Sequence, residues 1–164
     1  MAVAIRPAVP SDFAALLALN EESVHFLSPL DETRLSRLLA ESSLCVVTSE
    51  GEGGAVDGFL LALREGVAYD SPNYRWFAAR YPIFLYVDRI VIAAAAQGRG
   101  RGGALYTELF RVAREMAVPF VTAEFDVEPP NEGSRRLHGA FGFAEVGRQT
   151  LAAGKVVSLQ QATP

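Results

Sequence analysis

The feature that most constrains this chain is a glycine-rich turn, Gln97-Gly98-Arg99-Gly100-Arg101-Gly102-Gly103. The apolar segment before it, Ile83–Ile92, predicts a β-strand, and Gly102–Ala117 after it has apolar residues at helical spacing. Glycine lets a backbone approach a ligand closely, and the first amides of a helix lack partners within the helix. The turn therefore predicts a phosphate or pyrophosphate site, to which Arg99 and Arg101 add positive charge.

Two other phosphate-binding motifs are weaker interpretations of the same turn. Gly98–Gly103 matches G-x-G-x-x-G, and Glu124 follows at about the spacing of the acidic residue in the dinucleotide fingerprint. The chain after the turn is too short for a second mononucleotide-binding half, and the strands before it are expected to be antiparallel. No Gly-Lys-Ser/Thr follows the turn, so a nucleoside-triphosphate loop is excluded.

The rest of the chain predicts alternating strands and helices around this turn. Since a strand, a helix and a strand follow one another from Ile83 to Val127, these two strands should be parallel. We read the connection Glu65–Pro82 as a long aromatic loop. The other expected elements are a strand at Val3–Arg6, helices from an N-cap at Ser11 to Glu22 and from about Asp31, an antiparallel pair at Leu44–Thr48 and Val56–Arg64, a strand at Phe120–Val127, a helix at Ser134–Phe141, and a hairpin of Ala144–Thr150 with Lys155–Gln160.

Size and charge narrow the class of protein. The 164 residues, half of them hydrophobic, fit one domain over 1–164. The net charge of −4 gives no long-range attraction to nucleic acid or to an anionic membrane. Cys45 is the single cysteine, so no internal disulfide forms, and no apolar run is long enough for a membrane span. We expect a cytoplasmic protein without a metal site.

Two blocks of residues resemble the GNAT superfamily of N-acetyltransferases. Gln97-x-x-Gly100-x-Gly102 fits the family's Gln/Arg-x-x-Gly-x-Gly/Ala signature, and a second block downstream fits its pattern of strand end, asparagine, small residue, short helix and Gly-Phe. The resemblance implies an α/β (α+β) fold: a central mixed sheet of six to seven strands, splayed between two parallel strands and flanked by about four helices. The second block consists of Val127, Asn131, Ser134, Leu137, His138 and Phe141-Gly142-Phe143.

The resemblance also implies where acetyl-coenzyme A binds. The backbone of the strand Ile90-Val91-Ile92 would meet the pantetheine arm and the acetyl carbonyl, and Gln97–Gly103 would hold the pyrophosphate. Asn131, Ser134 and His138 would line the other side of the coenzyme.

Direct transfer to an amine needs a base, because an alkyl amine with a pKa of ~10.4 is protonated at neutral pH. Asp88 and Glu124, on the two parallel strands, are the candidates, each with the alternative of pairing with an arginine such as Arg89. His138 stands where the family usually has a tyrosine acid, so it is a candidate proton donor or a packing residue.

The sequence therefore predicts transfer of an acetyl group from acetyl-CoA to a primary amine of a small molecule or peptide. The amine is expected to enter beside His25-Phe26 and the aromatic connection, and apolar residues of the terminal hairpin would suit a homodimer. Two alternatives stay open: an acyl-CoA sensor that has lost catalysis, and the less favoured nicotinamide-dinucleotide-binding protein.

Overall fold

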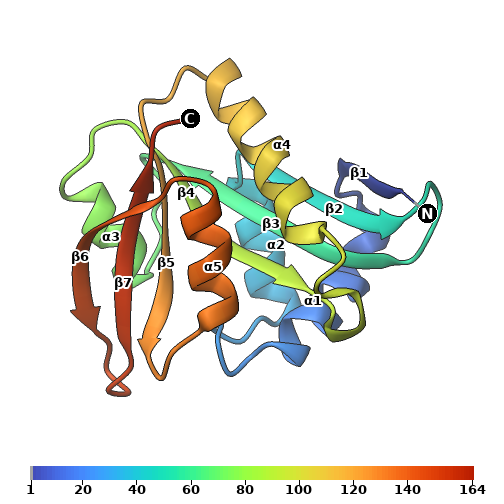
Figure 1. The fold of residues 1–164 in the computed structure, drawn as a ribbon, viewed down its shortest axis with the longest axis horizontal. Helices are drawn as coiled ribbons and strands as arrows, with labels where there is room; N and C mark the ends of the chain where they lie inside the picture. Colours follow the sequence, from blue (N-terminus) through green and yellow to red (C-terminus); the bar gives the residue numbers. More distant parts are fainter. Residues whose placement is uncertain (1) are drawn as a thin grey trace. The chain divides into compact units, whose positions relative to one another are not determined.

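The computed structural model describes residues 2–164 (Figure 1). Within this range the chain forms seven strands, five α-helices and two 3-10 helices. In chain order they are β1 Val3–Pro7, η1 Pro10–Asp12, α1 Phe13–Glu22, α2 Glu32–Glu41, β2 Leu44–Glu50, β3 Val56–Arg64, α3 Pro72–Ala78, β4 Leu85–Ile92, η2 Ala94–Ala96, α4 Arg101–Glu115, β5 Val121–Glu128, α5 Glu132–Ala140, β6 Ala144–Thr150 and β7 Val156–Ala162.

The residues gather in two compact units. The first comprises the described residues of Met1–Ala62 together with Arg89–Leu109, and the second comprises Leu63–Asp88 and Phe110–Pro164. Strands β3 and β4 and helix α4 each run from one unit into the other. The seven strands form one mixed sheet in the order β1-β2-β3-β4-β5-β7-β6, which confirms the predicted mixed sheet of six to seven strands.

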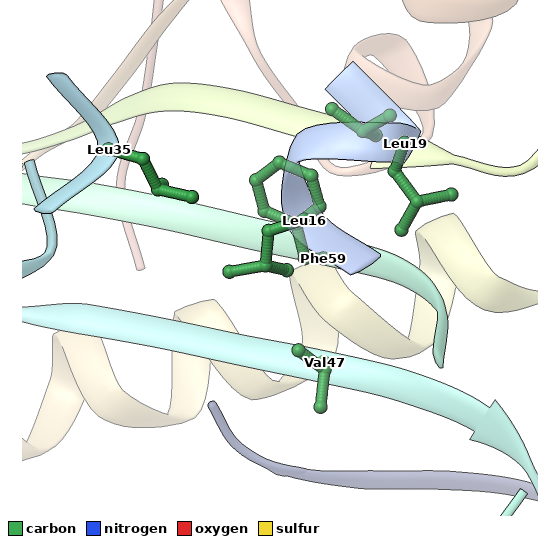
Figure 2. Packing of buried hydrophobic residues seen from close by; sticks show 6 residues of the cluster. Leu16, Leu19, Leu35, Val47 and Phe59 are labelled. Carbon is green, nitrogen blue, oxygen red and sulfur yellow. The ribbon is translucent and has the colours of Figure 1, made fainter. Parts of the chain in front are cut away.

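The first unit is an antiparallel ladder covered by helices α1 and α2. β1 pairs with β2 and β2 with β3, both antiparallel. Leu16 and Leu19 of α1 and Leu35 of α2 pack with Val47 of β2 and Phe59 of β3, and each of these side chains is buried (Figure 2). The regularly spaced apolar residues of both helices thus form the face that covers the ladder.

The first helix begins differently from the prediction. Ser11 is not its N-cap, because Pro10–Asp12 forms a 3-10 turn. The Asp12 carboxylate instead accepts the Val9 amide at 2.8 Å and two bonds from Arg6, at 2.7 and 2.8 Å. The second helix starts as predicted, since the Asp31 side chain accepts the Arg34 amide at 2.7 Å.

The second unit contains a parallel pair of strands, β4 and β5. Leu85 and Tyr86 of β4 lie opposite Val121 and Thr122 of β5, which confirms the predicted parallel arrangement. β5 then pairs antiparallel with β7, and β7 with β6. Because a dinucleotide-binding fold needs a doubly wound parallel sheet, this topology excludes the nicotinamide alternative.

The connection Glu65–Pro82 was read as a loop, and that prediction was wrong, because it contains α3. Ser71 caps this helix by accepting the Tyr74 amide at 3.3 Å, and Pro72 occupies the first turn. Tyr74 and Phe77 are buried, and the Trp76 ring lies so close to Gly147 of β6 that a Cβ there would come within 2.5 Å of it. Most of these aromatic residues are therefore packing residues of the second unit.

The first unit's core should depend on Leu35. Replacing this fully buried residue with alanine should lower the free energy of unfolding by about 2–5 kcal/mol, because the surrounding side chains cannot fill the cavity. Val9→Ala, at a side chain that is 47% exposed, should change it by less than about 0.5 kcal/mol. Urea denaturation of both variants measures the difference, and equal losses would contradict this description of the core.

Candidate active site

The glycine-rich turn joins β4 to α4 in the first unit, as predicted. Gly98 and Gly100 have φ angles of 73° and 81°, in the left-handed region that favours glycine, and both are exposed. The Ala104 amide bonds the Gly100 carbonyl at 3.0 Å. The amides of Arg101 to Gly103 therefore precede the first amide that donates within α4, and they lie at the positive end of this helix.

Side chains also tie this turn to its surroundings within the unit. The Gln97 amide reaches back to the Ile92 carbonyl at 3.4 Å, and Glu22 of α1 accepts the Ala94 amide at 3.0 Å. The two predicted arginines differ: Arg99 is exposed, whereas Arg101 is 5% exposed and bonds Asp57 at 2.7 and 3.0 Å. The turn thus keeps one exposed guanidinium.

The strand residues before the turn alternate between two faces. Val91 is buried in the core below α1 and α2, while Ile90 and Ile92 are half-buried. In the preceding position on β4, Arg89 donates to Asn20 at 2.7 Å and to the Ser28 hydroxyl at 3.1 Å. Arg89 thereby fixes the connection between α1 and α2 that also holds His25 and Phe26.

Asp88 and Glu124 lie on the second unit's parallel strands, each beside a tyrosine. Tyr69 donates to Asp88 Oδ1 at 2.6 Å, and Tyr86 donates to Glu124 Oε1 at 2.9 Å. The β4–β5 pairing in this unit covers Tyr86 and Thr122 but neither Asp88 nor Glu124. Both carboxylates therefore lie just beyond the paired residues of this ladder, and the charge of Asp88 acts on Glu124.

Burial makes Glu124 the most strongly perturbed carboxyl of this cluster. Its Oε2 atom is buried and has no well-aligned hydrogen bond among the described residues. Desolvation is the main cause that raises the Glu124 pKa to about 8, and the negative charges of Asp88 and Asp126 add to it. The hydrogen bond from Tyr86 and the nearby Asn73 amide partly oppose the rise.

His138 lies in α5, 2% exposed, between two aromatic rings. Its ring centroid is 5.5 Å from that of Phe125 and 5.0 Å from that of Phe143. Nδ1 lies 2.7 Å from the Ser134 carbonyl, an acceptor, so Nδ1 carries the proton. Because burial lowers the His138 pKa to about 4, the ring is neutral at pH 7.

Asn131 and Ser134 form the start of the same helix. Asn131 Oδ1 accepts the Ser134 amide at 3.1 Å as the N-cap of α5, and the Ser134 hydroxyl is 3.2 Å from His138 Nδ1. The three predicted residues therefore lie together within the first two turns of α5. Their placement follows from local helix geometry.

Sequence reasoning missed Tyr86 and Asn73 as neighbours of the candidate base. Tyr86 was detectable in part, because it lies two residues before Asp88 and so on the same face of β4. Asn73 had no such signal, since it belongs to the helix that was read as a loop. Its Oδ1 accepts a hydrogen bond from Gln149 of β6 at 3.1 Å.

The sequence profile of the Acetyltransferase (GNAT) family matches residues 14–143. The chain belongs to this family. The predicted membership is thus confirmed, and with it the acyltransferase class. Among curated protein sequences, none matches the chain significantly.

Solved structures of GNAT proteins share the fold. An N-acetyltransferase from Staphylococcus aureus has a TM-score of 0.74 at 20% identity, over 99% of each chain. An acetyltransferase from Salmonella typhimurium with acetyl-CoA bound has 0.71 at 20%, over 99% of this chain and 94% of its own. Ard1 from Thermoplasma volcanium has 0.79 at 14%, over 99% and 98%. These likenesses confirm the predicted GNAT fold.

The raised pKa of Glu124 predicts how stability depends on pH. Between its ordinary value of 4.5 and about 8 the folded protein keeps a proton that the unfolded chain releases, so stability falls as pH rises through this window. Glu124→Gln should remove up to about 1.4 kcal/mol of this loss per pH unit. Urea denaturation at pH 5, 6.5 and 8 measures it.

Glu132→Gln, at an exposed glutamate of the same unit, controls for the loss of a negative charge. The interpretation of Glu124 as a buried, proton-holding carboxyl is wrong if wild type and Glu124→Gln lose stability equally across this range.

Proposed function

We propose that this GNAT acetyltransferase transfers the acetyl group of acetyl-CoA directly to a primary amine of a small molecule or peptide. The observation that supports the proposal most is the turn from β4 to α4. Its left-handed Gly98 and Gly100 are exposed and lead directly into the N-terminus of a 15-residue helix, a place that suits a diphosphate. The likeness to the Salmonella typhimurium protein, whose structure contains acetyl-CoA, agrees with this co-substrate.

Within this proposal each group of residues binds a different part of the coenzyme. The amides of Gly98 to Gly103 hold the diphosphate, and the exposed Arg99 adds charge. The backbone of Ile90, Val91 and Ile92 faces the pantetheine arm. Asn131, Ser134 and His138 line the other side, as the family resemblance implies.

Glu124 is the proposed base, and Asp88 acts on it through its charge. A base works best when its pKa is close to the working pH, and the Glu124 pKa of about 8 meets this condition. Asp88 already accepts the Tyr69 hydroxyl at 2.6 Å. Glu124 therefore takes a proton from the ammonium, directly or through water, and the free amine attacks the acetyl carbonyl.

The leaving thiolate then needs no acid from α5. His138 is neutral at pH 7 and its one ring proton is directed to the Ser134 carbonyl, so this ring has no proton to give to sulfur. A thiol pKa of ~8.5 makes the thiolate a tolerable leaving group without help. His138 accordingly packs beside the coenzyme in place of the usual tyrosine.

The same neutral histidine supports the second candidate, an acyl-CoA sensor that binds the coenzyme without transferring its acetyl group. Thiol release with a panel of amines separates the two functions. Binding of acetyl-CoA with no turnover on any amine would favour the sensor.

A cytoplasmic location and a homodimer remain parts of the proposal. In the described residues no helix is long and apolar enough to cross a membrane.

The coenzyme site predicts the effect of Gly100→Ala. A side chain at φ 81° is strained, so the turn should relax and the Kd for acetyl-CoA should rise by about tenfold or more. Gly66→Ala is a matched control, because Gly66 has φ 85° with equally open space around it, in the turn after β3. Titration calorimetry should show unchanged affinity for the control, and equal affinities of both variants would refute the site.

The base predicts the pH profile of catalysis. Wild-type kcat/KM should rise with pH and level off above about 8, as the Glu124 carboxyl loses its proton. Glu124→Gln should lower kcat by about 10²-fold or more and abolish this rise. Asp88→Asn should shift the rise to lower pH, because losing the neighbouring negative charge lowers the Glu124 pKa. Thiol-release assays from pH 6 to 9.5 measure all three, and an unchanged profile in Glu124→Gln would exclude it as the base.

A further inference from the structure

Asp57 of β3 holds both ends of the connection from β4 to α4, which contains the glycine-rich turn. At the entry to the turn, the Asp57 backbone carbonyl accepts the Ala93 amide at 2.8 Å. At its exit, Asp57 Oδ2 accepts Arg101 Nε at 3.0 Å and Nη2 at 2.7 Å. Since Arg101 is the first residue of α4, this ion pair, in which one carboxylate oxygen accepts two guanidinium N–H groups, fixes the start of the helix relative to the strand.

The Asp57 carboxylate is itself held in place. Its other oxygen, Oδ1, accepts the Thr48 hydroxyl of β2 at 2.8 Å. The neighbouring Gly58 leaves no room for a side chain, because a Cβ there would come within 2.6 Å of Thr48 Oγ1 and 3.2 Å of the Val91 carbonyl. The closely packed strands β2, β3 and β4 therefore support the carboxylate, and its position is set before any ligand arrives.

These contacts also occupy Arg101. The Nη1 atom, the one that Asp57 does not take, donates to the Arg99 carbonyl at 3.3 Å, and the residue is 5% exposed. A buried guanidinium bonded to a carboxylate cannot turn to a diphosphate without leaving an unpaired buried charge, which is costly. Arg99 is exposed, so burial does not restrict its side chain in this way.

We propose that Thr48, Asp57 and Arg101 form a clamp that positions the glycine-rich turn, and that Arg101 favours coenzyme binding through Asp57 rather than by touching the diphosphate. This inference rests on the proposed acetyl-CoA site. It makes Asp57, a residue with no expected contact to the coenzyme, a positioning residue. Glycines make the turn flexible, and the clamp makes it more rigid. Coenzyme binding therefore loses less conformational entropy.

A double-mutant cycle on coenzyme affinity tests the clamp. Asp57→Asn, Arg101→Met and the double variant are compared with wild type by titration calorimetry with acetyl-CoA. Each single variant should raise Kd about tenfold, and the double variant should be no worse than either, because both remove the same device. If Arg101 instead bound the diphosphate directly, Asp57→Asn would leave Kd unchanged or lower it.

Asp12→Asn is the matched control, because it breaks a bidentate Arg6–Asp12 pair of the same unit, far along the chain from the turn. It should lower the melting temperature without changing Kd. If Asp57→Asn proves unfolded in a melting scan, Thr48→Val tests the same idea, since it removes only the hydroxyl that holds Oδ1. A several-fold rise in Kd supports the clamp, and an unchanged Kd overturns it.

S-acetylpantetheine, which lacks the diphosphate, separates positioning of the turn from general damage. Asp57→Asn should reduce kcat/KM with acetyl-CoA about tenfold and leave kcat/KM with S-acetylpantetheine within about twofold of wild type. Equal losses with both donors would overturn the clamp. Failure of wild type to bind acetyl-CoA would instead refute the proposed function, so the two failures are distinguishable.

Discussion

The chain depends on a backbone conformation that only glycine adopts readily, the left-handed dihedrals at Gly98 and Gly100. They let a buried strand pass into a helix whose first amides have no acceptor within the helix. No side chain of the turn could supply this arrangement, because the amides gather only if the backbone reverses sharply there. In a protein with a net charge of −4, such a local concentration of partial positive charge is what makes an anion site possible.

Carboxylates that are buried or half-buried divide into two kinds by their partners. Asp12 and Asp57 each accept two hydrogen bonds from an arginine, so their charges are compensated and they hold parts of the fold together. Glu124 has a tyrosine hydroxyl and a nearby amide for partners, together with the negative charges of Asp88 and Asp126. A buried carboxyl without a cation binds a proton more tightly, and this property distinguishes a chemical role from a structural one.

The sequence predicted what depends on local patterns. β3 was predicted at its observed bounds, Val56–Arg64, and the second helix was predicted from about Asp31, which is the N-cap of α2. Helix α3, which has only seven residues, was missed although Ser71-Pro72 is a start signal and the buried Tyr74 and Phe77 are three residues apart. The Asp57–Arg101 pair was not predictable, since its partners are 44 residues apart and nothing local links them.

The difference between local patterns and long-range contacts also explains why the role of His138 was hard to predict from the sequence. A histidine in the place of a tyrosine reads from sequence as a replacement acid, because its ordinary pKa is close to neutral. That interpretation presumes access to water. The ring instead lies between Phe125 and Phe143, and its Nδ1–H donates a hydrogen bond to the Ser134 carbonyl. Burial thus lowers the His138 pKa so far that this residue of α5 cannot act as the acid its type suggests. Burial also raises the pKa of Glu124 on β5 into the range that suits proton transfer near neutral pH.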